Sequence, residues 1–188
     1  MPDDIARAAA ALGCDLAAVR AVCQVEAPGG GFLPDGRPKI LFEAHIFHRL
    51  TSGRYDGAAP TISSPIWDRS LYGPEGGHQY ERLAAAVALD EVSAVQSASW
   101  GLFQVLGENF RRCGFASVHA FVAAMTMGEG AHLDAFVRYV SADSRMVAAL
   151  RSSDWPTFAR LYNGRRYADN QYDVKLAAAY ATAGTTEV

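Results

Sequence analysis

The chain has 188 residues, a formal net charge of -3 at pH 7, and a composition that is 50% hydrophobic and 20% charged. This length and balance are typical of one globular domain with a substantial core, and they argue against an extensively disordered chain. The slightly acidic charge offers no basic face of the kind that nucleic-acid binding usually needs, and no stretch approaches the roughly 18 apolar residues of a membrane span. We therefore expect no nucleic-acid partner and no membrane partner.

Three cysteines, Cys14, Cys23 and Cys113, lack the spacing of a metal-binding motif, so we expect small buried thiols and no metal or other cofactor. Their odd number and the absence of a disulfide framework indicate folding in a reducing compartment. The acidic N-terminus, Met-Pro-Asp-Asp, is not followed by an apolar signal core. We expect a protein that is made in the cytoplasm without a signal peptide.

Two short helices are predicted at the start of the chain. Asp3 or Asp4 can cap a helix that runs through Leu12. Asp15 can cap a second helix over Leu16–Glu26, which carries an apolar stripe at helical spacing.

A loop-rich stretch follows these helices. The run from Pro28 to Pro38 contains four glycines and three prolines and is predicted to be loop. Lys39–Glu43 is a short β-like run, and a helix is expected over Ala44–Leu50. Thr51–Gly77 is rich in Gly, Pro and Ser and has no sustained period. It predicts a small β-hairpin or an irregular lobe, and its length is typical of a functional flap.

Helical periodicity returns from His78 onward, without an internal repeat or a linker. The sequence therefore predicts a mainly α (α+β) chain that forms a single domain over residues 1–188, with an irregular or β lobe at about 28–77. The remaining predicted helices lie at His78–Asp90, Val92–Ser99, Gly107–Cys113, Ser117–Met127, Glu129–Ser141, Asp143–Leu150, Asp154–Tyr162 and Asn170–Ala183.

Glu26 is the first candidate for chemistry, because it ends a predicted helix and is followed closely by Pro28 and three glycines. A carboxylate at a helix C-terminus is electrostatically unfavourable. That position, beside mobile glycine backbone, suits the edge of an active-site cleft. The alternative is an exposed surface glutamate.

Two later segments carry polar groups of the kind that bind sugars. In the segment Ser99 to Gln104, which contains Gly101, the Gln104 amide can both donate and accept hydrogen bonds. The alternative is a buried helix with one satisfied amide. Tyr162 and Asn163 offer a ring face, a hydroxyl and an amide just before a glycine, although such residues are also common at helix ends.

The order of these pieces resembles the lysozyme-like superfamily, specifically goose-type lysozymes and lytic transglycosylases. The resemblance is closest to the N-acetylmuramidase family found in phage endolysins of Gram-negative hosts, and it spans about Ile5 to Tyr180. The segments that carry it are Val25-Glu26, Ile40 to His45 with Phe47 and Arg49, Ser97 to Gln104, Asp154-Trp155, and Phe158 to Gly164.

The resemblance implies a lysozyme-like helical domain with a small lobe flanking the active-site cleft. It also implies hydrolysis of the β-1,4 bond between N-acetylmuramic acid and N-acetylglucosamine in peptidoglycan. In that family the glutamate corresponding to Glu26 is the general acid. The resemblance also implies that Ser99, Gly101 and Gln104 line the cleft and that Tyr162 and Asn163 contact the sugar.

Two departures bear on this interpretation. Relatives often carry a separate peptidoglycan-binding module before the catalytic domain, whereas here the catalytic pattern starts at once and no such module is expected. Lytic transglycosylases generally have Ser after the acidic Glu, whereas this chain has Ala27. The transglycosylase alternative, which forms a 1,6-anhydro product without adding water, is disfavoured but stays open.

Glycosidic cleavage needs one protonated carboxylic acid near neutral pH, and desolvation by apolar neighbours can keep Glu26 in that form. The second group is open among Glu43, Asp56, Asp35 and Asp68. We favour Glu43, because the β-like run before it can project it toward the cleft. Its alternative role is to pair with Arg49 or to orient His45.

Other groups near Glu43 invite further interpretations. His45 and His48 could form a zinc pair with Glu43, although the familiar His-Glu-x-x-His order is absent. Aromatic residues around the irregular segment could stack on sugars, and some of them belong to the core. These are Tyr55, Trp67, Tyr72 and Tyr80.

Two rival functions belong to other classes. The first two helices could resemble a helix-turn-helix, but Arg20 is the only basic residue of the second one, which leaves too few phosphate contacts. A non-catalytic wall-binding protein is the other rival. For the enzyme we expect a monomer whose partner is the peptidoglycan glycan strand. It would act on the periplasmic wall after release through a holin pore, as the resemblance implies, or after secretion as an effector.

Overall fold

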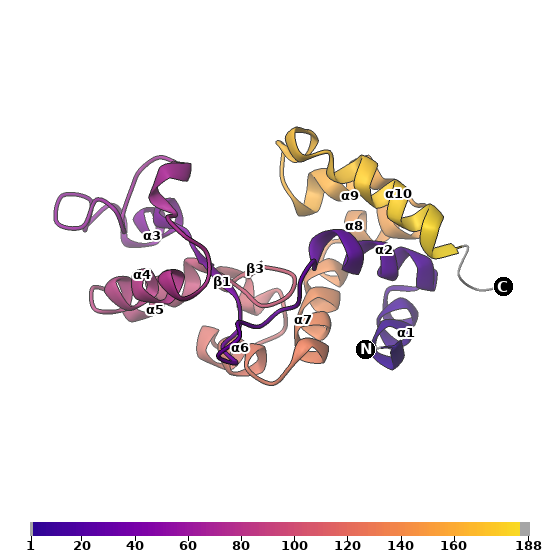
Figure 1. Ribbon diagram of the computed structural model, residues 1–188, viewed down its shortest axis with the longest axis horizontal. Helices are drawn as coiled ribbons and strands as arrows, with labels where there is room; N and C mark the ends of the chain where they lie inside the picture. Colours follow the sequence, from indigo (N-terminus) through magenta and orange to yellow (C-terminus); the bar gives the residue numbers. More distant parts are fainter. Residues whose placement is uncertain (1, 185–188) are drawn as a thin grey trace. The chain divides into compact units, whose positions relative to one another are not determined.

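The computed structural model describes residues 2–184, which fold into two compact units. Unit 1 combines the described parts of Met1–Gly30 and Glu129–Val188, and unit 2 is formed by Gly31–Gly128. Unit 1 therefore joins the two ends of the chain, whereas unit 2 is one continuous segment (Figure 1).

Unit 1 is helical throughout its regular structure. Helix α2 packs against α10 and α1, α9 packs against α8 and α10, and α7 packs against α1 and α8. Figure 1 shows α10, near the C-terminus, beside α2 from the N-terminus and beside α9. The elements are α1 (Pro2–Leu12), α2 (Leu16–Glu26), α7 (Glu129–Ser141), α8 (Ser144–Arg151), α9 (Trp155–Tyr162), the 3-10 helix η3 (Tyr167–Asn170) and α10 (Tyr172–Gly184).

Aspartate caps start several of these helices where the sequence predicts. Asp15 accepts a hydrogen bond from the N–H of Ala18 at 2.7 Å, and Asp154 accepts one from the N–H of Thr157 at 3.1 Å. Such caps satisfy backbone donors that have no partner in the first helical turn. The core that the helices enclose comprises Leu12, Val19, Val22, Leu133, Phe136, Val140, Leu150, Phe158 and Leu176.

Unit 2 combines short helices with a small antiparallel sheet in the order β1-β2-β3. Ile40 pairs with Trp100, which in turn pairs with Val105. The elements are β1 (Ile40–Phe42), α3 (Ala44–Thr51), the 3-10 helix η1 (Arg69–Leu71), α4 (Gly77–Val87), α5 (Glu91–Gln96), β2 (Ala98–Trp100), β3 (Val105–Leu106), the 3-10 helix η2 (Gly107–Arg111) and α6 (Val118–Met125).

Close packing in unit 2 depends on one glycine. A Cβ added to Gly107 would lie 2.3 Å from the backbone oxygen of Val95, so only glycine lets η2 approach the end of α5 this closely. The buried aromatic residues of unit 2 include Phe42, Phe47, Trp100, Phe103, Phe110 and Phe121.

The sequence predictions hold for most helices and fail where tertiary pairing intervenes. The bounds predicted for α2 and α7 are confirmed, and the mainly α architecture is confirmed as well. The helix predicted over Val92–Ser99 is wrong at its end, because Ala98–Trp100 pairs with both neighbouring strands. The helix predicted over Gly107–Cys113 is a 3-10 helix, and the hairpin considered for Thr51–Gly77 is absent from this described segment.

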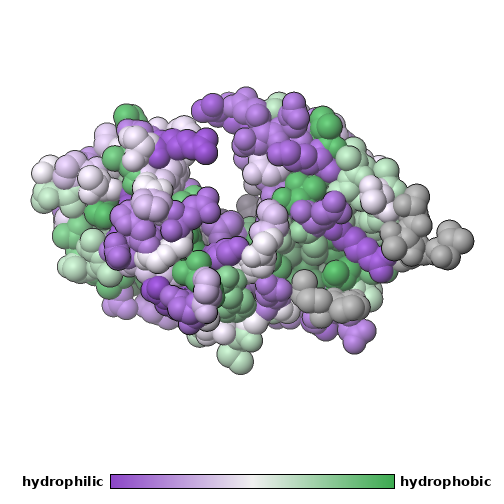
Figure 2. Space-filling model, in the orientation of Figure 1, coloured by the Kyte–Doolittle hydropathy of each residue, from purple (hydrophilic) through white to green (hydrophobic). Residues whose placement is uncertain are grey.

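The visible face of each unit is covered largely by hydrophilic residues, with hydrophobic residues interspersed (Figure 2). Within residues 2–184 no single helix has the length and apolar character to span a membrane. Helices α1 and α2 meet the length and composition criteria only when taken together, and they are bent by 112° relative to each other.

Candidate active site

Glu26 is the last residue of α2, as the sequence predicts. Ala27 caps the helix, and its N–H still donates to the Cys23 carbonyl at 3.1 Å. The side-chain amide of Asn163 donates from Nδ2 to both carboxyl oxygens of Glu26, at 3.1 Å each. Two candidates separated by 137 positions in the sequence are therefore in direct contact within unit 1.

Burial changes the acid–base behaviour of Glu26. Its pKa rises from 4.5 to about 7, because desolvation disfavours the charged carboxylate more than the Asn163 hydrogen bond and the Lys175 charge favour it. A large fraction of Glu26 is therefore protonated near neutral pH, which a proton donor to a leaving oxygen requires.

Asn163 has an unused hydrogen-bonding atom beside this carboxyl group. The residue ends α9, where its backbone N–H donates to the Ala159 carbonyl. Its side-chain Oδ1 is buried and has no hydrogen-bond partner within the described chain. A buried polar atom without a partner is costly, so this oxygen is a candidate acceptor for a ligand N–H or O–H.

Tyr162 has a packing role within unit 1. Its ring stacks on Phe158 at a centroid distance of 5.6 Å and meets Phe136 and Tyr139 edge-on at 5.5 and 5.9 Å. The side chain is only partly buried. These ring contacts stiffen the end of α9 on which Asn163 lies, and a sugar contact by Tyr162 stays a prediction.

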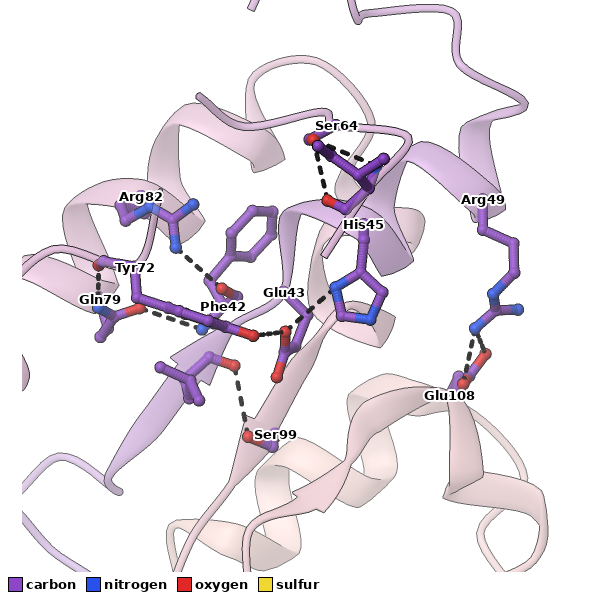
Figure 3. A network of polar contacts seen from close by, with 12 residues as sticks. Phe42, Glu43, His45, Arg49, Ser64, Tyr72, Gln79, Arg82, Ser99 and Glu108 are labelled. Carbon is purple, nitrogen blue, oxygen red and sulfur yellow. Dashed lines mark hydrogen bonds and ion pairs between the residues drawn. The ribbon is translucent and has the colours of Figure 1, made fainter. Parts of the chain in front are cut away.

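Glu43 lies in unit 2, between the end of β1 and the start of α3. Its Oε2 accepts a hydrogen bond from the Tyr72 hydroxyl and lies 3.3 Å from Nδ1 of His45. Figure 3 shows both groups turned toward that one oxygen. Among residues 2–184, Oε1 accepts no hydrogen bond, and the side chain is 18% exposed.

Glu43 is also shifted toward its neutral form. Burial raises its pKa, whereas the Tyr72 hydrogen bond and electrostatic interactions with His45 and Arg82 oppose the rise. The suggested pairing with Arg49 is wrong, because the Arg49 guanidinium donates to both oxygens of Glu108 at 2.7 and 2.8 Å. The suggested contact with His45 is present.

The other candidate carboxylates each serve a local structural contact. Asp56 accepts from His48 Nδ1 at 2.8 Å, Asp35 pairs with Arg37, and Asp68 accepts from the N–H of Ser70 at the start of η1. In each case hydrogen bonds hold the pKa of the aspartate below its ordinary value. Glu43 is the one of the four whose pKa is raised.

Ser99 lies in β2, and Gly101 and Gln104 lie in the turn between β2 and β3, so the alternative of a buried helix is wrong. The Ser99 hydroxyl donates to Gln104 Oε1 at 2.9 Å, and Gln104 Nε2 donates to the Gly101 carbonyl at 2.8 Å. Gly101 has a φ of 70°, a conformation that glycine adopts without strain. The three predicted residues are therefore together, and the exposed Gln104 is held by the other two.

The suggested zinc pair does not form a metal cluster in the described chain. His48 contacts Asp56 rather than Glu43. No group of three or more His, Cys, Asp or Glu side chains within residues 2–184 has the arrangement to hold a metal ion.

The aromatic candidates separate into packed and exposed rings. Tyr55 stacks on Phe47 and donates its hydroxyl to the Leu89 carbonyl at 2.7 Å. Tyr80 donates to the Pro38 carbonyl and is covered by Arg37. Trp67 is 53% exposed and meets Tyr72 edge-on, so it keeps a face for sugar stacking.

Sequence reasoning missed the buried polar side chains that organise the Glu43 region. Gln79 and Arg82 lie three positions apart on α4, among alanines and Leu83, and both are buried. Their spacing places them on one face of a helix. This shared helix face is the only local sign that the two side chains act together. The sequence does not show that the face is buried.

These features define a mainly α protein that carries a buried carboxyl group of raised pKa beside an amide, an arrangement that suits a glycosidase. A model of the Muramidase family, described as N-acetylmuramidase, matches residues 15–184. The chain therefore belongs to the N-acetylmuramidase family, and the resemblance inferred from its motifs is confirmed.

A solved structure supports the same assignment. The chain is similar to the endolysin of Burkholderia phage AP3, with a TM-score of 0.93 and 44% sequence identity over 100% of this chain and 72% of the endolysin chain. The lysozyme-like, mainly α fold is thereby confirmed. No curated protein shows significant similarity to the chain.

Proposed function

We propose that the protein is an endolysin-like N-acetylmuramidase that hydrolyses the β-1,4 bond between N-acetylmuramic acid and N-acetylglucosamine in peptidoglycan. Membership of the family and the likeness to a phage endolysin support a peptidoglycan hydrolase. The observation that carries the assignment of roles is the buried Glu26 carboxyl, whose pKa is raised to about 7.

Glu26 is the proposed general acid. Its carboxyl proton passes to the glycosidic oxygen as the bond from that oxygen to the sugar C1 breaks, so that the leaving sugar departs as a neutral alcohol. Asn163 holds both carboxyl oxygens through Nδ2, which orients the acid.

Glu43 is the proposed second carboxylate. In an inverting reaction it takes a proton from the water that attacks C1, and in a retaining reaction it attacks C1 itself. Both roles need an ionised oxygen that is not already engaged, and Oε1 has no partner among the described residues. The anomeric configuration of the first product, measured by NMR, distinguishes the inverting reaction from the retaining one.

Sugar binding is assigned to five residues. The free Oδ1 of Asn163 suits the N–H of an acetamido group, because that atom is buried and otherwise lacks a donor. The exposed Gln104 can contact sugar hydroxyls while Ser99 and Gly101 fix its orientation. Tyr162 completes the set through its partly exposed ring.

The direct test compares muropeptides released by the wild type and by Glu26→Gln. The wild type should release reducing ends that carry one added water, and the variant should release almost none while keeping its circular dichroism spectrum. Products with a 1,6-anhydro end would instead establish the transglycosylase alternative. A wild type that leaves the turbidity of outer-membrane-permeabilised cells unchanged would favour the wall-binding alternative.

The cellular setting follows from the substrate. We propose that the protein acts as a monomer on glycan strands of the periplasmic wall, without a nucleic-acid or membrane partner. Release through a holin pore and secretion as an effector are both consistent with a substrate outside the cytoplasmic membrane.

A further inference from the structure

Tyr72 contacts Glu43 although it lies 29 positions further along the chain, next to η1. Its hydroxyl donates to Oε2, the oxygen that also lies 3.3 Å from His45 Nδ1. Both contacts therefore involve the same carboxyl oxygen, Oε2, and Oε1 has no hydrogen-bond partner in the described chain (Figure 3).

The buried side-chain amide of Gln79, on α4, bonds to the backbone near both Tyr72 and Glu43. Gln79 is 1% exposed. Its Nε2 donates to the backbone oxygens of Tyr72 and Pro74 at 2.7 and 2.9 Å, and its Oε1 accepts from the N–H of Phe42 at 3.1 Å. Because Phe42 directly precedes Glu43, one side chain sets the position of both the donor and the acceptor. Figure 3 shows the hydrogen bonds of Gln79 with Tyr72 and Phe42.

A buried arginine on the same helix face reinforces this arrangement. Arg82 donates to the backbone oxygens of Phe42 and Thr61, at 2.8 Å each. It forms no ion pair with a carboxylate in the described part of the chain, so its positive charge acts on Glu43 at longer range. A buried frame of this kind is rigid because each of its polar atoms would be costly to leave unpaired.

We propose that Tyr72 is a positioning residue for Glu43, holding the carboxylate by Oε2 so that Oε1 is the oxygen presented to the reaction. The proposal rests on the role of Glu43 in the proposed function. Tyr72 does not itself exchange a proton or form a bond with the substrate in this scheme. It acts by selecting one rotamer and by favouring the ionised form.

The charged and titratable groups that face Glu43 are Tyr72, His45 and Arg82. A hydroxyl that donates to a carboxylate stabilises the charged form, so Tyr72 lowers the pKa of Glu43 against the opposing effect of burial. Replacing Tyr72 by Phe removes the oxygen atom that contacts Glu43 and the Trp67 side chain, and it keeps the ring that meets Trp67 edge-on. His45 and Arg82 stay in place.

The test is Tyr72→Phe with two readouts. The pKa of Glu43 is measured by NMR titration of protein labelled with ¹³C at the glutamate carboxyl groups, with Glu43→Gln used to assign the resonance. Turnover of purified peptidoglycan is measured against pH. Tyr55→Phe is the matched control, because it deletes another hydroxyl of unit 2, whose hydrogen-bond partners within residues 2–184 are the Leu89 carbonyl and Arg54.

We expect Tyr72→Phe to raise the pKa of Glu43 by about one pH unit and to move the acidic limb of the rate profile upward by the same amount. Turnover at the optimum should fall about tenfold, with KM little changed. Tyr55→Phe should alter neither the Glu43 pKa nor the acidic limb, although it loses one hydrogen bond.

The outcomes for Tyr72→Phe and for Glu43→Gln overturn different parts of the proposal. A Tyr72→Phe variant with an unchanged Glu43 pKa, or with a raised pKa but a wild-type rate profile, would overturn the role of Tyr72 alone. Wild-type activity in Glu43→Gln would overturn the role of Glu43 in the proposed function, and the role of Tyr72 with it.

Discussion

Glu26→Gln should make the folded protein more stable at neutral pH while it abolishes wall lysis. The pKa of Glu26 is 4.5 as an ordinary glutamate and about 7 in the folded protein. Because the folded value is the higher one, the unfolded state releases the proton first as the pH rises. The stability that Glu26 contributes is therefore fully present below about pH 4.5, falls through the interval up to about pH 7 and is lost above it.

The size of this effect follows from the two pKa values. One pKa unit corresponds to about 1.4 kcal/mol, so ionisation of buried Glu26 costs the folded state about 3 kcal/mol above pH 7. Glutamine resembles the neutral acid and does not ionise. It also finds a partner, because a rotated Asn163 amide can present its currently unpaired Oδ1 to the new amide N–H.

The assay is urea unfolding of the wild type and Glu26→Gln between pH 4 and pH 8. The difference in unfolding free energy should be near zero at pH 4 and grow to about 3 kcal/mol in favour of the variant at pH 8. Glu75→Gln, which alters an exposed carboxylate in unit 2, should stay within about 0.5 kcal/mol of the wild type throughout. A difference for Glu26→Gln that does not depend on pH would refute the reasoning.

Three further outcomes are expected. Asn163→Ala removes a hydrogen bond that favours ionised Glu26, so the alkaline limb of the pH–rate profile should move upward by about one pH unit while the peak rate falls; a downward shift would contradict this. Glu43→Gln should lower turnover by about 10² to 10⁴-fold with a thermal midpoint close to the wild type, and a large drop in the midpoint with modest activity loss would indicate a structural role instead. Gly101→Ala places a side chain at a φ of 70°, so it should destabilise the protein by about 1 kcal/mol in urea unfolding and weaken substrate binding through the displaced Gln104.

The position of Glu26 at the end of α2 was predictable because its signals are local. Asp15 begins the helix, and the proline and glycines after Ala27 prevent its continuation. Such signals act over one or two helical turns, so they are fully contained in the sequence. The motif resemblance then predicted the family, which the family match confirms.

The end of β2 and the turn after it, Ser99 to Gln104, were not predictable in the same way. Their residues are compatible with a buried helix, and the strand forms because Ala98–Trp100 finds partners in β1 and β3. Strand pairing depends on segments distant in the sequence, which no local pattern reports.

The sequence by itself determined the helices that are capped and terminated locally, the family, and the identity of the candidate acid. Only the tertiary structure decided what surrounds that acid and its proposed counterpart. Burial raises the pKa of Glu26, and Asn163 reaches it from 137 positions away. Tyr72, rather than Arg49, holds Glu43. Desolvation and long-range hydrogen bonds exist only once the chain is packed, which is why the surroundings of both carboxyl groups follow from the fold and not from their neighbours in sequence.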